Sequence, residues 1–183
     1  MGKRKQKGVF IIELSIILVF LSALCAMQIN IMIATSKKGQ MERLAYSLVG
    51  ILSEREEFFR DKGNMCESPT FCTILADELY DIAIKSMERM SSSFDSSDFG
   101  FQIEEYIKSE HENKYSVRRR GATSGCNFYT IDGVDTIIPQ TAKGTNLPIY
   151  QVSLCYATPF NLIGISNGQF THITASAFSY ARY

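Results

Sequence analysis

The first third of the chain is dominated by one long apolar stretch that contains a single charged residue. Between Val9 and Thr35 the only charge is Glu13. A helix of this length reaches about 40 Å, which exceeds the hydrocarbon thickness of a bilayer. We therefore expect a transmembrane helix over residues 9–36.

Beyond the apolar stretch, hydrophobic residues recur at separations of three and four, which keeps one face of a helix apolar. This pattern predicts that the first helix continues to about residue 60, with Gly39 as a candidate hinge, and that its second half packs on the rest of the protein. The residues expected on its buried face are Met41, Leu44, Leu48, Ile51 and Phe58.

A second helix is predicted from Thr73 to about Met90, because apolar residues again recur at helical spacing. The residues expected to face inward are Leu75, Leu79, Ile82 and Met90. The stretch Ser91–Asp98 consists mostly of serine and aspartate, and this composition is typical of a polar loop.

After this loop the pattern changes to the alternation and the β-branched and aromatic content of strands. The predicted strands cover residues 99–103, 127–131, 149–156 and 171–180. Helices followed by strands indicate an α+β fold, here a long N-terminal helix leading to a second helix and an antiparallel β-sheet.

Charge is distributed unevenly along the chain. Basic and acidic residues number 19 each, but Lys3, Arg4, Lys5 and Lys7 all lie in the first eight residues, so removal of residues 1–8 leaves 19 − 4 = 15 basic against 19 acidic side chains. A mildly acidic remainder gives no electrostatic reason to expect nucleic-acid binding. The basic run Arg118–Arg120 is interpreted as a solvated turn or strand end.

The basic leader also predicts the topology of the membrane helix. Four cations precede the apolar stretch, and only Lys37 and Lys38 follow it closely. The excess of positive charge favours a cytoplasmic N-terminus. Residues 37–183 are then expected to form an exported ectodomain.

Four cysteines lie in the expected ectodomain, and an even number of exported cysteines in an oxidising compartment is first interpreted as disulfides. Three pairings are possible. We favour Cys66–Cys72, which flank one turn, and Cys126–Cys155, which occupy two predicted strands. A zinc site is disfavoured because the cysteines lack the paired Cys-x-x-Cys spacing. Cys25 is expected to be a small apolar side chain within the membrane.

Enzymatic chemistry finds little support in the sequence, and we predict no catalytic residue, no metal site and no cofactor. The two histidines, His111 and His172, are far apart in the chain, and no catalytic or phosphate-binding motif is present. The acidic pairs Glu56–Glu57 and Glu104–Glu105 are expected to be solvated.

Glu13 is the feature that indicates a function, because a carboxylate inside a membrane segment is costly to insert. It lies five residues after Gly8, which ends the basic leader. This arrangement resembles a type IV prepilin. The resemblance implies that a prepilin peptidase cuts after Gly8, that Val9 becomes the mature N-terminus and is a candidate for methylation, and that Glu13 pairs with an N-terminal amine during filament assembly.

Residues just past the membrane helix, Ala45–Val49 and Leu52–Arg55, together with the long cysteine-bearing remainder, are similar to the TadF pseudopilins of the tight-adherence (Tad) pilus system. Leu14 follows Glu13, where the short major pilins carry tyrosine. The resemblance implies a minor pilin of the inner membrane, with its ectodomain in the periplasm or on the pilus, that contributes to pilus biogenesis, secretion and surface adherence. The implied partners are prepilin peptidase, other Tad pilins and pseudopilins, and the inner-membrane assembly platform.

Other interpretations of the N-terminus remain open. An ordinary secretory signal is disfavoured because the apolar stretch is long, and a lipoprotein signal because Leu24 precedes Cys25. An uncleaved membrane anchor that carries an envelope scaffold domain remains an alternative. A pseudopilin of a type II secretion system, or a major subunit of another pilus, shares the same helix.

Overall fold

The computed structural model describes residues 6–58, 65–66, 69–109, 113–133, 138–141, 144, 146–157 and 172–181. The described elements are, in chain order, α1 (Gln6–Phe58), α2 (Pro69–Met90), a short 3-10 helix η1 (Ser96–Asp98), β1 (Phe99–Ile107), β2 (Lys114–Gly121), β3 (Ile149–Ala157) and β4 (His172–Tyr180). The strands form one antiparallel sheet in the order β2-β1-β3-β4. The predicted α+β fold is confirmed.

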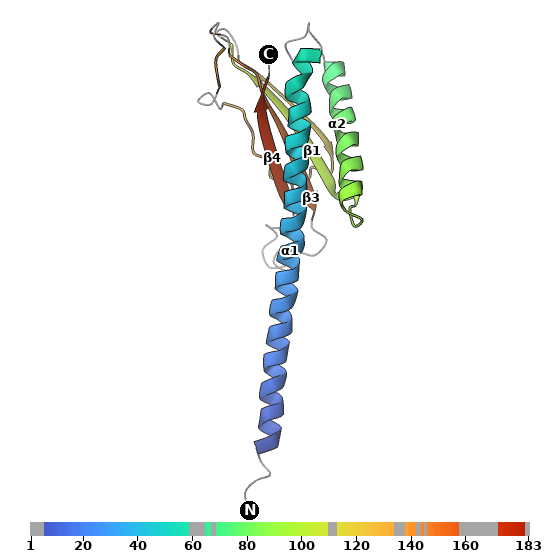
Figure 1. The fold of residues 1–183 in the computed structure, drawn as a ribbon, viewed down its shortest axis with the longest axis vertical. Coiled ribbons are helices and arrows are strands. Elements are labelled where there is room, and N and C mark those ends of the chain that lie inside the picture. Colours follow the sequence, from blue (N-terminus) through green and yellow to red (C-terminus); the bar gives the residue numbers. More distant parts are fainter. Residues whose placement is uncertain are drawn as a thin grey trace, which may run out of the picture.

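Helix α1 is the longest element, and it runs without interruption from the apolar stretch into the folded body. It contains 53 residues, which corresponds to about 80 Å. Its N-terminal half projects from the body, while its C-terminal half lies beside the sheet (Figure 1). Gly39 lies within the continuous helix, so the structure has no break at the predicted hinge.

Both helices cover the same face of the sheet and enclose the main core with it. Helix α1 packs against β3 and β4, whereas α2 packs against β1 and β2. Alternate residues of β1, namely Phe99, Phe101 and Ile103, point into this core and are fully buried. A sheet needs such cover because its apolar face has to be removed from water.

The buried face of α1 agrees with the prediction in its first two turns and differs further along. Met41, Leu44 and Leu48 are buried, but Ile51 is 47% exposed and Leu52 takes its place in the core. Positions 48 and 52 are one helical turn apart, so the helix keeps its apolar face by a spacing of four. The side chain of Phe58 lies outside the described residues.

Helix α2 shows the same kind of difference. Leu75 and Leu79 are buried as predicted, whereas Ile82 and Met90 are 43% and 40% exposed. The helix also begins at Pro69, four residues before the predicted start at Thr73. The α2 side chains that complete the core are Cys72, Ala76, Ala83 and Met87.

The sheet contains one strand that was not predicted and lacks one that was. Lys114–Gly121 forms the edge strand β2 opposite β1, and it includes the basic run Arg118–Arg120. Residues 127–131 were predicted as a strand but belong to no strand. The strands predicted near residues 99, 149 and 171 are confirmed, and β1 extends further, to Ile107.

Residues 122–131, which we call the strap, cross the face of the sheet opposite the helices. The strap begins close to β1, where the backbone N–H of Ala122 donates to the carbonyl of Phe99 at 2.9 Å. A Cβ atom on Gly100 would lie 2.4 Å from the carbonyl oxygen of Ala122, so this close approach requires glycine. The strap ends at Ile131, which is buried against Tyr106 and Ile149.

Candidate functional site

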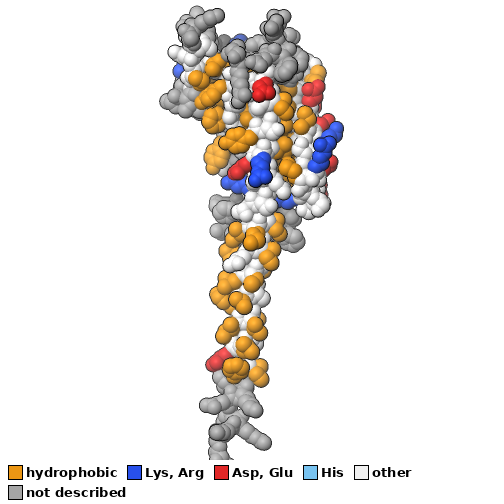
Figure 2. Space-filling view, in the orientation of Figure 1, with side chains coloured by type: hydrophobic (Ala, Val, Ile, Leu, Met, Phe, Trp, Pro, Cys, Tyr) orange, Lys and Arg blue, Asp and Glu red, His pale blue; other side chains and the backbone are white. Residues whose placement is uncertain are grey.

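The projecting half of α1 presents apolar side chains on all its sides. Between Phe10 and Ile33 the large hydrophobic residues are all exposed, and no other described element covers them (Figure 2). This is the one described helix long and apolar enough to cross a membrane, and an 18-residue window within it has a mean hydropathy of 2.5. Such a surface is stable only against lipid or against other apolar helices.

Glu13 lies on this apolar surface and is exposed. Gly8 and Val9, which flank the predicted cleavage site, belong to the first turns of α1, and their side chains lie outside the described ones. Val9 and Glu13 are four residues apart, or slightly more than one helical turn. The structure therefore puts Glu13 and the backbone of Val9 on neighbouring turns of one helix.

Besides Glu13, the described polar side chains of the projecting half are Ser15, Ser22, Gln28, Asn30, Thr35 and Ser36. The hydroxyls of Ser22 and Thr35 donate to backbone carbonyls one turn earlier, at 2.8 and 2.9 Å. Gln28 and Asn30 have no hydrogen-bond partner among the described residues. Ser22 and Thr35 can therefore enter a membrane without an external partner, whereas the two amides cannot.

The projecting half meets the folded body at Lys37, which is only 9% exposed. Its ammonium group donates to the hydroxyl of Ser91, lies 3.3 Å from the hydroxyl of Ser93, and lies 5.7 Å from the centre of the Tyr156 ring. The ring of Phe94 stacks on the same tyrosine, with centroids 5.4 Å apart. The loop after α2 is thus fixed to α1 where α1 leaves the body.

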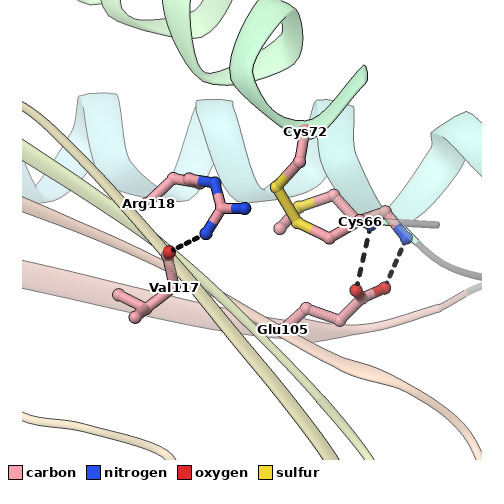
Figure 3. Close-up of a disulfide and its surroundings, with 6 residues drawn as sticks. Cys66, Cys72, Glu105, Val117 and Arg118 are labelled. Atoms are coloured by element: carbon pink, nitrogen blue, oxygen red, sulfur yellow. Dashed lines mark hydrogen bonds between the residues drawn. A yellow bond between two sulfur atoms is a disulfide. The ribbon is translucent and has the colours of Figure 1, made fainter. Parts of the chain in front are cut away.

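A disulfide joins Cys66 and Cys72 at the far end of the body, with Cα atoms 4.6 Å apart. The carboxylate of Glu105 on β1 accepts from the backbone N–H groups of Met65 and Cys66, at 2.6 and 3.2 Å (Figure 3). Glu105 is 2% exposed. The connection between α1 and α2 is therefore held both by a covalent bridge and by a buried carboxylate.

A second disulfide joins Cys126 on the strap to Cys155 on β3, with Cα atoms 6.0 Å apart. Cys126 lies on the strap and not on a neighbouring strand, so the bridge connects two layers of the fold. Cys25 is a free, exposed cysteine on α1. The described residues contain no group of three or more side chains that could hold a metal ion.

Glu104 is buried between the sheet and the strap and accepts four hydrogen bonds. One carboxylate oxygen accepts from Gln102 at 3.0 Å and from the hydroxyl of Tyr115. The other accepts from the backbone N–H of Ile131 at 3.3 Å and from the amide of Gln151 at 3.1 Å. Burial, followed by the hydrogen bond to Glu104, raises the pKa of Tyr115 to about 12.

The expectation that Glu104 and Glu105 are solvated is wrong, since they are 1% and 2% exposed. Their side chains point to opposite faces of β1 because successive residues of a strand alternate. The side chains of Glu56 and Glu57 lie outside the described ones. A usable signal existed in the sequence, because Gln102 and Glu104, like Gln151 and Ser153, place polar groups at every second position of apolar strands.

The basic run on β2 is engaged by neighbouring elements. Arg119 donates to the amide oxygen of Gln102 at 2.6 Å and lies over the ring of Phe128. Arg120 forms an ion pair with Asp77 on α2, and this hydrogen bond lowers the pKa of Asp77. Arg118 donates to the carbonyl of Val117 (Figure 3). The run therefore lies at the C-terminal end of β2, as the strand-end alternative predicts, and contacts both of its neighbouring layers. It does not form a turn.

Comparison with known proteins gives one match. Residues 2–182 match the model of the TadF family, which is described as "Putative tight adherence pilin protein F". No curated protein matches the chain, and no solved structure does. The match covers nearly the whole sequence, and the long apolar helix α1 agrees with the membrane anchoring and the contacts with other pilus components that a pilin requires. The chain belongs to the TadF family of tight adherence pilins.

Proposed function

We propose that this protein is a minor pilin of the tight-adherence pilus that is cut by prepilin peptidase after Gly8. The proposed precursor has three parts: a basic leader of residues 1–8, a membrane helix of residues 9–36, and a periplasmic ectodomain of residues 37–183. The leader faces the cytoplasm, in agreement with its four cations. The protein has a structural role and no catalytic one.

The observation that carries this proposal is the exposed carboxylate of Glu13 on an otherwise uncharged and mostly apolar helical surface. Inserting a carboxylate costs roughly 2.5–3.5 kcal/mol at the centre of a membrane helix and less near its end. A cut after Gly8 creates a positively charged amine on Val9, one turn away. Pairing of this amine with Glu13, in the same subunit or in a neighbour, would offset the cost of insertion.

Pairing between subunits supplies a reason to retain the charge during assembly. An incoming subunit with an unpaired Val9 amine neutralises the Glu13 carboxylate of its neighbour. The exposed apolar surface from Phe10 to Ile33 then packs on the helices of other pilins. We propose that the protein acts in this way with other Tad pilins and pseudopilins on the inner-membrane platform, and so contributes to pilus biogenesis, secretion and surface adherence.

The N-terminal sequence and intact mass of the protein from native membranes test the cleavage. We expect a start at Val9 when prepilin peptidase is present and a start at Met1 or Gly2 when it is absent. The Gly8→Ala variant should remain full length in both strains. An unprocessed protein in the presence of the peptidase would contradict the proposal and favour the uncleaved anchor with a scaffold domain.

A further inference from the structure

The amide of Gln28 needs a hydrogen-bond partner that the described part of the chain does not supply. Its side chain is exposed on the apolar half of α1 and has no hydrogen-bond partner among the described residues. Hydrocarbon offers neither donors nor acceptors, so a polar group at this depth needs a partner from another helix. Glu13 has the new N-terminal amine as a proposed partner, but no such group is close to Gln28 in the sequence.

The two membrane amides lie on different sides of α1. From Asn30, steps of four, three and four residues lead to Ala34, Lys37 and Met41, the last two of which are buried under the sheet. From Gln28, the same steps lead to Met32, Thr35 and Gly39, and a further seven residues lead to Tyr46, which is 67% exposed. Gln28 therefore lies on the side of α1 that the described part of the folded body leaves free.

Two glycines lie on the same free side. Gly39 and Gly50 are inside the helix, where glycine is disfavoured, and a Cβ atom on either would meet nothing within 4 Å. Nothing in the described part of the chain explains their small size. Close approach of a second helix backbone along this side would explain it, since small residues allow helices to come together.

We propose that two copies of this chain pair in the membrane through the free side of α1, with their Gln28 amides hydrogen-bonded to each other. All copies insert in the same direction, so Gln28 of one copy meets Gln28 of the other at the same depth. An amide carries both donors and an acceptor, which makes it complementary to a second copy of itself. The described parts of the two folded bodies then lie on the outer sides of the pair and do not collide.

The opposite arrangement, with pairing through Asn30, brings the two bodies together. Asn30 is on the side of α1 that continues into the buried residues Lys37 and Met41. A parallel copy at the same depth would place its own sheet where the first sheet lies. Asn30 is therefore the matched control for Gln28: the same chemistry, two residues away, on a side that a parallel copy cannot use.

The native cysteine of α1 provides the measurement. Cys25 is exposed, free and three residues before Gln28 on the same side. The full-length protein, purified alone and reconstituted into phospholipid vesicles, is treated with a mild oxidant such as copper phenanthroline, which removes two electrons and two protons from a pair of Cys25 thiols. We expect a disulfide-linked dimer on a non-reducing denaturing gel, and none in Cys25→Ser.

Variants of α1 test whether the Gln28 amide is responsible for pairing of the two copies. Gln28→Leu should weaken pairing about three- to twentyfold, the range measured for hydrogen bonds between membrane helices, and Gly39→Leu should weaken it by blocking close approach. Asn30→Leu should pair as the unchanged protein does. The proposal would be overturned if Gln28→Leu is linked as well as the unchanged protein, or if Asn30→Leu loses as much linking as Gln28→Leu. It would also be overturned if the dimer forms only in native membranes, because another pilus component would then be the partner. The vesicles contain no prepilin peptidase, so the result does not depend on cleavage after Gly8.

Discussion

Glu104 shows how a buried charge can be stabilised without direct contact to a cation. Among the described residues it is surrounded by four hydrogen-bond donors. The positive charge of Arg119 reaches it through the amide of Gln102, which accepts from Arg119 and donates to Glu104. Hydrogen bonds to a charged group contribute about 1.5–3 kcal/mol each, roughly twice those between neutral groups.

Replacement of Glu104 should therefore destabilise the folded body strongly. In Glu104→Gln one acceptor oxygen becomes an NH₂ donor that faces other donors, and we expect a loss of about 1–3 kcal/mol in the free energy of unfolding. Glu104→Leu leaves the donors of Gln102 and Ile131 without this acceptor, while Tyr115 and Gln151 keep a further partner, and should cost about 3–5 kcal/mol. Urea unfolding of the full-length protein in detergent micelles measures both losses, and a stability equal to that of the unchanged protein would show that the network is not stabilising.

The pH dependence of Tyr115 offers a second measure of the same network. Its pKa is raised to about 12, so the folded protein holds this proton more tightly than the unfolded chain. This difference in proton binding adds to the free energy of unfolding below pH 10, and the added stability is lost as the pH rises through 12. In Glu104→Gln the pKa of Tyr115 should move back toward 10, which the absorbance of tyrosinate reports against a Tyr115→Phe control.

Glu104 and Glu105 are buried although their sequence predicts exposure, because the environment of a side chain is not a local property. Glu104 and Glu105 form an adjacent acidic pair that would be solvated on an exposed strand. Both are buried because β1 is covered on one face by the helices and on the other by the strap. The donors to Glu104 come from β1, β2, β3 and the strap. The alternation of polar residues marks a polar face on β1 and β3, but it does not indicate that donors from four elements meet at one carboxylate.

At the level of elements, the strap explains why one strand was placed wrongly. Residues 127–131 alternate as a strand does, but their backbone bonds to side chains of the sheet and not to a neighbouring strand. Gln151 donates to the carbonyl of Tyr129, and Ile131 donates to Glu104. The edge strand β2 was missed because its basic run was interpreted as a solvated turn or strand end, although charged residues commonly protect an edge strand.

The elements that were predicted well are those whose pattern reflects direct contact with apolar surroundings. β3 and β4 are rich in β-branched, aromatic and small residues and form neighbouring strands. The two helices were recognised from their spacing, but the exact buried residues depended on the angle at which each helix meets the sheet. Ile51 and Leu52, adjacent in sequence and opposite in exposure, illustrate that limit.

The two disulfides should stabilise the fold to different degrees. The chain-entropy model gives about 3–4 kcal/mol for the Cys126–Cys155 bridge, whose cysteines are 29 positions apart, and about 2 kcal/mol for Cys66–Cys72, 6 positions apart. Paired replacement by serine, Cys126→Ser with Cys155→Ser and Cys66→Ser with Cys72→Ser, tests this order by urea unfolding. A larger loss for the shorter loop would show that Glu105 and its neighbours depend on that bridge.

For the whole molecule, the proposed pairing of charges predicts a separation between processing and assembly. Glu13→Ala should still be cut after Gly8, because the leader and the cleavage site are unchanged, but pilus formation should fall. Glu13→Asp, which keeps the charge on a shorter side chain, should retain part of the assembly. The measurements are the N-terminal sequence of the protein and the amount of sheared pili. Normal piliation of Glu13→Ala would remove the assembly role.

Because the junction at Lys37 is fixed, the membrane helix and the folded body should move together as one rigid body. No flexible stalk separates them, because α1 continues through Gly39 and the loop at Ser91 holds it from the side. The part of α1 beyond Lys37 extends about 30 Å, so a tilt of 20° in the bilayer, a common value for membrane helices, would move its far end sideways by about 10 Å. A change in how the helix sits among lipids or neighbouring subunits would thus be transmitted mechanically to the outer end of the protein.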